Sequence, residues 1–223
     1  MLSHFDSVTE REICELIVGS PTKSCMLDPI PTSLMKQCRN DLVPLVTAII
    51  DVSLSTGTVF MQFKHAVVVP LLKKPGLDTN DLKHFRPVSN LPFTSKVLEM
   101  IVLRQLQKHL SYNRLLEIYQ PAYRINPSTE TAVMSVLDCL LVKADERFVS
   151  LIALLDLSAA FDTLDHSILL KRLQVTLGVR DAALEWFASY LSDRSKSVIV
   201  GGIVSAPNPF VYEVPQSCVL GLS

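Results

Sequence analysis

Paired cysteines are missing from this sequence. The five cysteines, at positions 14, 25, 38, 139 and 218, are odd in number and include no C-x-x-C pair. A zinc site built on cysteine pairs and a disulfide framework are therefore both disfavoured. We expect reduced thiols in a nuclear or cytoplasmic protein that is not secreted.

Long apolar runs and an excess of charge are missing as well. The longest apolar stretch, "LVPLVTAIIDVSL", is interrupted by Pro44 and Asp51, so we predict no transmembrane helix and no membrane partner. The N-terminus is acidic where a signal peptide would be basic. With a net charge of −1 and 48% hydrophobic residues, the chain is predicted to fold and has no global attraction to nucleic acid.

Positive charge is instead gathered in one part of the chain. Between positions 64 and 104, seven Lys and Arg residues stand against three acids, a surplus of four. Lysines in such a region can follow phosphates without reading base sequence, and solvated loop charge is the alternative role for each. The lysines concerned are Lys64, Lys73, Lys74, Lys83 and Lys96.

Hydrophobic periodicity and capping residues predict a mostly helical chain. The first helix is predicted at 7–18, capped by Ser7 or Thr9, and the second at 34–56, bent near Pro44 and closed by Gly57. Further helices are predicted at 94–110, 128–144, 165–177 and 181–192. Trp186 is predicted to anchor the last of these in the core.

Strands are fewer and shorter. One is predicted at 64–74, where Pro70 indicates an edge or bulge, and one at 149–157, an apolar run typical of strands buried on both faces. A hairpin or two short strands fit 197–215, and 20–33, 75–92 and 119–127 are predicted to be loops. This irregular order of helices and strands predicts an α+β fold with a small sheet.

The most informative stretch is "SLIALLDLSAAFDTLDH", residues 150–166. It runs an apolar strand into Asp156, and a carboxylate beside a buried strand is costly unless it is paired or binds metal. Small residues at 158–160 let the chain turn close to a ligand, against which Phe161 can form an apolar wall. Asp156 is therefore a metal-ligand candidate, while a helix cap or a salt-bridged core aspartate stays open. Asp162, Asp165 and His166 are interpreted as capping and turn residues.

The extended stretch "LLDLSAAFDTLDHSILLKRL" resembles the first catalytic motif of reverse transcriptases from non-LTR (LINE-type) retrotransposons, closest to the chicken-repeat-like clade. Five further blocks, on both sides of this motif, fall in the family's order and spacing from about Ser24 onward. They are "SCMLDPIPTSLMKQC", "VVVPLLKKPGLDTNDLKHFRPVSNLPFTSKVLE", "STETA", "ALEWFASYLSDR" and "VPQSCVLG".

The resemblance implies the fingers and part of the palm of a right-hand polymerase. It divides the chain into an N-terminal helical extension at 1–57, fingers at 58–148 and a partial palm at 149–223. The implied reaction is DNA synthesis from dNTPs on an RNA template and a DNA primer. In that family, nucleotidyl transfer uses two metal ions, here expected to be Mg²⁺.

The resemblance also implies roles for residues near the first motif. Asp156 matches the first metal-binding carboxylate, and the Leu157 carbonyl matches the backbone ligand beside it. Phe161 matches the residue that packs under the sugar and disfavours a 2′-hydroxyl, with plain core packing as its alternative. Ala160 is one of the small residues that leave room for the nucleotide.

Three residues outside that motif complete the implied substrate site. Arg124 matches the fingers arginine that contacts the triphosphate, and Arg86 matches one near the template and nucleotide. A solvated surface charge is the alternative for either arginine. Gln216 matches the glutamine of the second catalytic motif, which lies along the nascent base pair.

The second motif departs from the family pattern. Glu213 and Ser217 replace two glycines that would allow close approach of the backbone to nucleotide, and Cys218 replaces a serine. A carboxylate at 213 would also repel phosphate. In the loop at 119–130, Pro121–Ala122 and Pro127 likewise replace the family's preferred residues.

The sequence given stops at Ser223, before the Asp-Asp pair that would complete the metal site. One carboxylate cannot hold two Mg²⁺ ions tightly, so we expect a truncated and inactive reverse transcriptase fragment. A truncated record of an active polymerase is one alternative. A co-opted, non-catalytic module that binds RNA or protein is the other.

Overall fold

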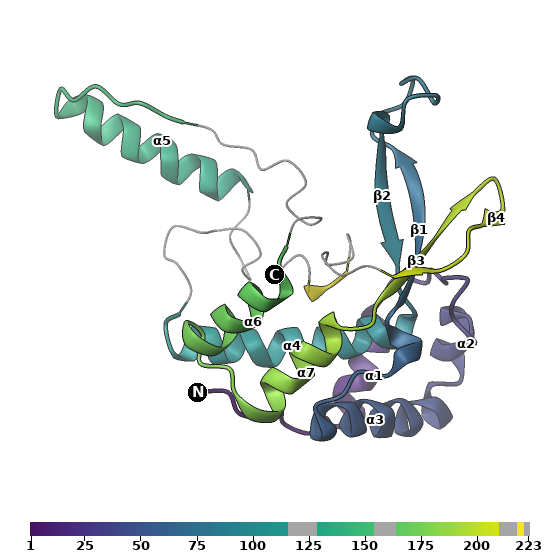
Figure 1. The fold of residues 1–223 in the computed structure, drawn as a ribbon. Coiled ribbons are helices and arrows are strands. Elements are labelled where there is room, and N and C mark those ends of the chain that lie inside the picture. Colours follow the sequence, from purple (N-terminus) through teal and green to yellow (C-terminus); the bar gives the residue numbers. More distant parts are fainter. Residues whose placement is uncertain (116–128, 154–163, 210–217, 221–223) are drawn as a thin grey trace.

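The computed structural model describes residues 1–115, 129–153, 164–209 and 218–220, and it joins a layer of helices to a small mixed sheet (Figure 1). The helices are α1 (Glu10–Gly19), α2 (Thr32–Gln37), α3 (Arg39–Thr56), α4 (Phe93–Tyr112), α5 (Thr129–Asp145), α6 (His166–Val175) and α7 (Asp181–Leu191). The strands are β1 (His65–Leu72), β2 (Phe85–Asn90), β3 (Ser195–Val200), β4 (Ile203–Val204) and β5 (Asn208–Pro209). The predicted α+β class is confirmed.

Local sequence signals set the ends of several helices. Thr9 caps α1 in a capping box, in which the Thr9 hydroxyl accepts from the Glu12 N–H and the Glu12 carboxylate accepts from the Thr9 N–H. Gly57 ends α3 in the left-handed conformation, with φ of 63°. Both ends are confirmed as predicted from the sequence.

The single helix predicted at 34–56 is two helices. The chain breaks at Cys38, between α2 and α3, while Pro44 lies inside α3. A proline deep in a helix removes a backbone hydrogen bond and crowds the preceding turn. The helix restarts at Arg39 and continues through Pro44, which lacks the N–H that would donate to the Asn40 carbonyl.

The sheet has the order β2-β1-β3-β4, and β5 also pairs with β3. β1 and β2 are antiparallel, from Val67 opposite Asn90 to Leu72 opposite Phe85. β1 and β3 are parallel only from His65 to Val68, so the outer half of β1 has β2 as its sole partner among the described strands. The hairpin predicted near the C-terminal end is confirmed as β3 and β4, which turn at Gly201 and Gly202.

β2 corrects the prediction of a continuous loop at 75–92. Pro87 lies within this strand, although proline cannot donate to a strand ladder. In the structure, Pro87 lies opposite Pro70 in the outer half of β1. β2 is an edge strand among the described strands, so the missing N–H leaves no neighbour without its hydrogen bond.

One hydrophobic core joins the helical layer. It contains Ile13 from α1, Ile50 from α3, Val97 from α4 and Trp186 from α7, all 0% exposed. These residues come from all three of the predicted segments, 1–57, 58–148 and 149–223, and the functional division of the chain stays a prediction. The core role predicted for Trp186 is confirmed.

A carboxylate from the loop before α2 fixes the start of α4. Asp28 Oδ1 accepts from the Phe93 N–H at 2.6 Å, and its Oδ2 accepts from the Cys25 N–H at 2.7 Å. The residue before α4, Pro92, makes no side-chain cap of its own. Asp28 therefore supplies an acceptor that this helix N-terminus would otherwise lack.

The strand predicted at 149–157 is wrong for its described part. Residues 149–153 form no strand, and 154–157 lie outside the described residues. Val149 is 101% exposed and Leu151 is 95% exposed. A buried strand needs neighbours that pair with its backbone and cover its faces, and the described strands pair elsewhere.

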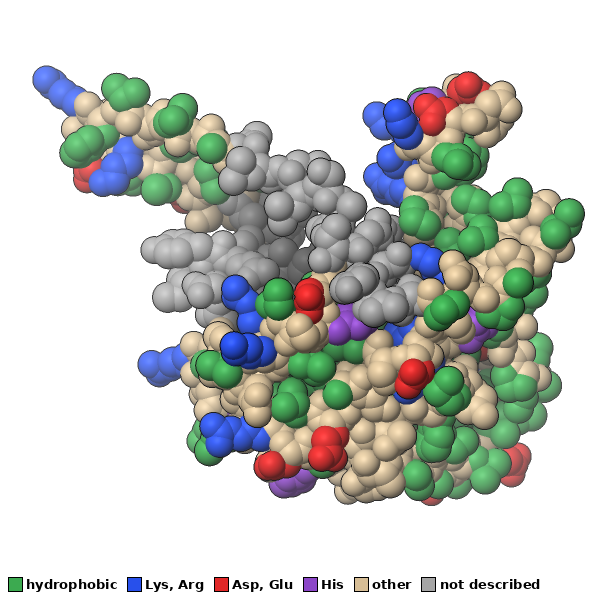
Figure 2. All heavy atoms as spheres, in the orientation of Figure 1, with side chains coloured by type: hydrophobic (Ala, Val, Ile, Leu, Met, Phe, Trp, Pro, Cys, Tyr) green, Lys and Arg blue, Asp and Glu red, His purple; other side chains and the backbone are tan. Residues whose placement is uncertain are grey.

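α5 also presents apolar side chains to solvent. In Figure 1 it lies apart from the helical layer, and Figure 2 shows hydrophobic side chains along it. The exposed apolar residues on and just after α5 are Val133, Met134, Val136, Leu137, Leu141, Val142 and Phe148. Neither α5 nor any other described helix is long and apolar enough to cross a membrane.

We expect the chain to self-associate through these exposed apolar residues. The double substitution Val149→Lys and Leu151→Lys should lower the average particle size measured by dynamic light scattering, because it places charge on the most exposed apolar stretch. Thr79→Lys with Asn80→Lys is the matched control, since it adds the same charge at exposed polar positions. An equal decrease in average particle size for both double variants would mean that net charge, and not the apolar stretch, governs association.

Candidate nucleic-acid interface and the segments around the catalytic motifs

The residues predicted to bind metal and nucleotide lie outside the described residues, with one exception, Arg86. Those outside are Asp156, Leu157, Ala160, Phe161, Arg124 and Gln216. Their roles therefore stay predictions. The structure describes what flanks these residues in the chain and where the predicted phosphate-binding cations lie.

The first motif leads into α6, and Asp165 fixes the start of that helix. Its Oδ1 accepts from the Ser167 N–H at 2.8 Å, the Ile168 N–H at 3.1 Å and the Ser167 hydroxyl at 2.6 Å. These bonds, that of the Ser167 hydroxyl first, hold the pKa of Asp165 below its ordinary value. The prediction that Asp165 is a capping residue is confirmed, and Asp162 lies outside the described residues.

The donors for the implied Mg²⁺ are not found elsewhere in the described chain. Within residues 1–115, 129–153, 164–209 and 218–220, no three His, Cys, Asp or Glu side chains lie close enough to hold a metal ion. The proposed ligands, Asp156 and the Leu157 carbonyl, are oxygen donors of the kind that Mg²⁺ prefers. The described residues alone do not provide a site for the ion.

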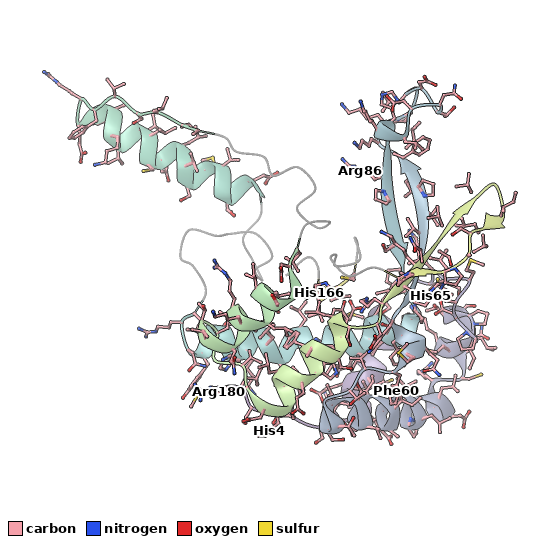
Figure 3. The ribbon with its side chains drawn as sticks, in the orientation of Figure 1. His4, Phe60, His65, Arg86, His166 and Arg180 are labelled. Atoms are coloured by element: carbon pink, nitrogen blue, oxygen red, sulfur yellow. The ribbon has the colours of Figure 1, made fainter. Side chains whose placement is uncertain are left out.

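Three of the five lysines predicted to follow phosphates, together with Arg86, lie on one projection of the molecule, which we call the basic hairpin. It consists of β1, β2 and the connecting residues 73–84. Lys73, Lys74, Lys83 and Arg86 are all exposed on it. Figure 2 shows their blue side chains along one side of this projection, and Figure 3 shows Arg86 extending outward from β2.

The backbone ladder places two of these cations on the same face of the basic hairpin. Arg86 lies opposite Leu71, and the Lys73 N–H donates to the His84 carbonyl at 2.8 Å, two pairs further along the ladder. Lys73 and Arg86 are therefore each two positions from the other's cross-strand partner, so their side chains leave the same face. Lys73 Nζ also donates to the Lys83 carbonyl, at 2.7 Å.

The two acids of the basic hairpin accept hydrogen bonds from backbone N–H groups of the connection between its strands. Asp78 Oδ1 accepts from the Asn80 N–H, and Asp81 Oδ1 accepts from the Lys83 N–H, both at 2.9 Å. Four exposed cations against these two acids leave a local surplus of two positive charges. The tip of the hairpin is thus held by its acids, and its cations are left to face solvent.

Lys64 is a correction to the predicted set of phosphate-following lysines. It is only 4% exposed, and its Nζ lies 3.5 Å from the Ser189 hydroxyl on α7. Burial lowers the pKa of the Lys64 ammonium, while the Asp193 carboxylate opposes that shift. A side chain enclosed between β1 and α7 cannot reach a nucleic-acid backbone. Lys96, on the first turn of α4, is half-buried.

A buried polar cluster lies where the second motif ends, and the sequence analysis missed it. Glu99 on α4 and Arg194, just after α7, are each 1% exposed. Glu99 accepts from the Tyr190 hydroxyl and from the backbone N–H groups of Val219 and Leu220. Glu99 was counted only as one of the acids between positions 64 and 104 of the sequence, so its burial was missed. Its position on the apolar face of the predicted helix could have indicated that burial.

The guanidinium of Arg194 completes this buried cluster. It lies over the Tyr190 ring, 4.5 Å from the centroid, and its Nη1 donates to the Tyr190 carbonyl at 2.8 Å. Its Nε and Nη2 have no hydrogen-bond partner among the described residues. The charge of Arg194 acts through space on Glu99, where it opposes the rise in pKa that burial imposes on that carboxyl.

Comparison with known families gives a match over most of the chain. The family model described as "Reverse transcriptase (RNA-dependent DNA polymerase)" matches residues 72–221. That range includes most of the basic hairpin, the buried Glu99 cluster and both predicted catalytic motifs.

Curated relatives match nearly the whole chain but are much longer. An RNA-directed DNA polymerase from the mobile element jockey of Drosophila melanogaster is 27% identical over 222 residues, which cover 96% of this chain and 23% of that protein. Probable RNA-directed DNA polymerases from the transposons BS and X-element of the same species are 26% and 25% identical, over 95% and 94% of this chain. The chain spans about a quarter of the length of these relatives, 23% in each case.

Proposed function

This chain belongs to the reverse transcriptase family, and from that membership we propose that it acts in RNA-directed DNA synthesis, with the basic hairpin guiding the nucleic-acid backbone. The observation that carries the proposal is the position of four exposed cations, Lys73, Lys74, Lys83 and Arg86, inside the matched range 72–221. Cations on a projecting hairpin can neutralise phosphates without reading bases. Arg86 adds a fork of donors suited to a phosphate or a base edge.

The catalytic part of the proposal concerns the segment around Asp156. Bound Mg²⁺ supplies activation of the primer 3′-hydroxyl and neutralises charge during phosphoryl transfer. The Asp156 carboxylate and the Leu157 carbonyl would hold the metal, and Phe161 with Ala160 would select a deoxyribose sugar. Arg124 contacts the triphosphate and Gln216 lies along the nascent base pair. These roles follow from the family resemblance residue by residue.

A second function, binding of RNA without chemistry, is favoured by the altered second motif. Glu213 places a carboxylate where the family has a glycine, and Ser217 replaces another glycine. Both changes disfavour close approach of phosphate and backbone. The basic hairpin would serve either function, so the two proposals differ in catalysis and agree on the nucleic-acid contact.

Binding of single-stranded RNA to the chain should be weak, sensitive to salt and indifferent to sequence. If about three or four phosphates are neutralised, log K should fall with log[salt] at a slope of about −2 to −3, using about −0.7 per phosphate. Lys73→Glu with Lys74→Glu should make that slope shallower by about 1.4, because two contacts are removed. Fluorescence anisotropy of labelled RNA at several salt concentrations measures both slopes.

The matched control is Lys23→Glu with Lys108→Glu. Both lysines are exposed and lie outside the basic hairpin, and the pair changes the net charge by the same amount as the hairpin pair. We expect the control to keep the slope of the unaltered chain. A slope near zero for that chain, or an equal loss in the control, would contradict the hairpin as the contact surface.

A further inference from the structure

The buried carboxylate of Glu99 has an unusual set of partners for a core residue. It lies on α4 between the fully buried Val97 and Val102, where an unpartnered charge would be strongly unfavourable. Its Oε2 accepts from the Val219 N–H at 2.7 Å and from the Leu220 N–H at 3.4 Å. Both hydrogen bonds to Oε2 thus come from backbone N–H groups that are distant from Glu99 in the chain.

The other oxygen ties the same segment to α7. Glu99 Oε1 accepts from the Tyr190 hydroxyl at 3.2 Å, and Tyr190 is 3% exposed beneath the Arg194 guanidinium. Cys218, just before the anchored N–H groups, is fully buried with Ala66 of β1 and Leu91. The backbone at 218–220 is thus held between α4, α7 and the base of β1.

The anchored residues directly follow the second catalytic motif. Gln216 stands three positions before Val219 in the chain, and none of the described strands pairs with residues 218–220. We propose that Glu99 is a positioning residue for the second catalytic motif, acting by fixing the backbone immediately after it to α4 and α7. This inference rests on the proposed function for its meaning. The anchor itself is a property of the folded chain and can be tested without nucleic acid.

A positioning role makes a different demand on residue 99 than simple packing. Packing needs an apolar shape, which leucine would supply better than glutamate. Anchoring needs an acceptor at the place of Oε2, which glutamine keeps and leucine loses. Leucine would leave the N–H groups of Val219 and Leu220 buried without acceptors. The variants Glu99→Gln and Glu99→Leu therefore separate the two roles.

Hydrogen exchange of the intact chain, read by mass spectrometry and NMR, tests the anchor. In the unaltered chain and in Glu99→Gln, the amides of Val219 and Leu220 should be protected. In Glu99→Leu they should exchange at least about tenfold faster, the loss expected for a hydrogen bond to a charged group. Tyr190→Phe is the control: it removes the third partner of Glu99 and the contact of the Tyr190 hydroxyl with the Cys218 thiol, but it keeps the acceptor at Oε2, so both amides should stay protected. Amides of α1 and α3 report whether each variant is folded.

A pH titration keeps the test decisive even where Glu99→Leu fails to fold. The groups that act on Glu99 are the Arg194 guanidinium, the Tyr190 hydroxyl and the backbone N–H groups of Val219 and Leu220, and the Cys218 thiol in turn contacts the Tyr190 hydroxyl. Burial raises the pKa of Glu99 above 4.5, and Arg194 with the N–H donors opposes that shift. The Val219 amide shift should therefore titrate with a midpoint above 4.5 in the unaltered chain and stay flat in Glu99→Gln.

Three results would overturn the proposal. They are fast exchange of Val219 and Leu220 in the unaltered chain, unchanged exchange in a folded Glu99→Leu variant, and a Val219 titration that persists in Glu99→Gln. None of these measurements uses RNA, nucleotide or metal. Failure of RNA binding would thus count against the proposed function and leave the anchor standing, and the reverse also holds.

Discussion

No incorporation of nucleotide above background is expected when the 223-residue chain is mixed with a primed RNA template, dNTPs and Mg²⁺ or Mn²⁺. Of the metal-binding carboxylates that the family resemblance implies, these residues contain one, Asp156. Groups that act as one catalytic unit lose on the order of 10⁴-fold or more in rate when part of the unit is missing. If Glu213 stands where the family resemblance implies, its carboxylate would also repel the incoming triphosphate.

Primer extension resolved on a denaturing gel measures this, with an active reverse transcriptase as the positive control. Asp156→Ala prepared in parallel identifies the source of any signal. Extension by the unaltered chain that disappears in Asp156→Ala would contradict the prediction and favour a catalytic reading over simple RNA binding. Signal that persists in Asp156→Ala would instead point to a contaminating polymerase.

Much of the fold was predictable because its signals are local. The Thr9–Glu12 capping box, Gly57 in the left-handed conformation and Asp165 at the start of α6 each depend on residues within one turn. The family was predictable for a different reason. Six motif blocks in a fixed order carry far more information than periodicity, and the match over 72–221 confirms that prediction.

The features that sequence reasoning missed depend on distant partners. β2 forms because β1 offers it a ladder, and Pro87 is tolerated because β2 is an edge among the described strands. Lys64 is buried because the chain before β1 meets Ser189 of α7, a contact between residues 125 positions apart. Neither outcome can be read from the residues next to Pro87 or Lys64.

The candidate site shows the same division. The exposure of Lys73, Lys74, Lys83 and Arg86 was predictable, because they stand in a polar stretch between apolar runs. Burial of Glu99 could be partly inferred from the sequence, since its helical spacing places it on the same face as Val102 and Leu106, which are buried. Its backbone partners at Val219 and Leu220 were not visible, because no local pattern pairs a helix glutamate with a segment some 120 positions later.

Replacing Trp186 should destabilise the helical layer more than any single surface change. Trp186 is 0% exposed, and its ring stacks on that of Tyr190 with the centroids 5.3 Å apart. The rings of Phe5 and Phe187 make T-shaped contacts with it. Its Nε1 donates to the Ser53 hydroxyl on α3 at 3.1 Å. Trp186→Ala should lower the free energy of unfolding by about 3–5 kcal/mol, the usual cost of removing a buried aromatic side chain.

That loss is a large part of the roughly 5–15 kcal/mol by which most domains are stable, so Trp186→Ala should unfold at much lower urea concentration. Circular dichroism at 222 nm is the suitable probe, because Trp186 is the only tryptophan in the chain and its replacement removes the usual fluorescence signal. Trp186→Phe keeps most of the ring packing and loses the bond to Ser53, so it should lower the free energy of unfolding by well under half as much.

Leu82→Ala is the matched control, since Leu82 is 86% exposed and should change the free energy of unfolding by less than about 0.5 kcal/mol. A loss below about 1 kcal/mol in Trp186→Ala would mean that α7 does not pack against α3 and Phe5 as the structure describes.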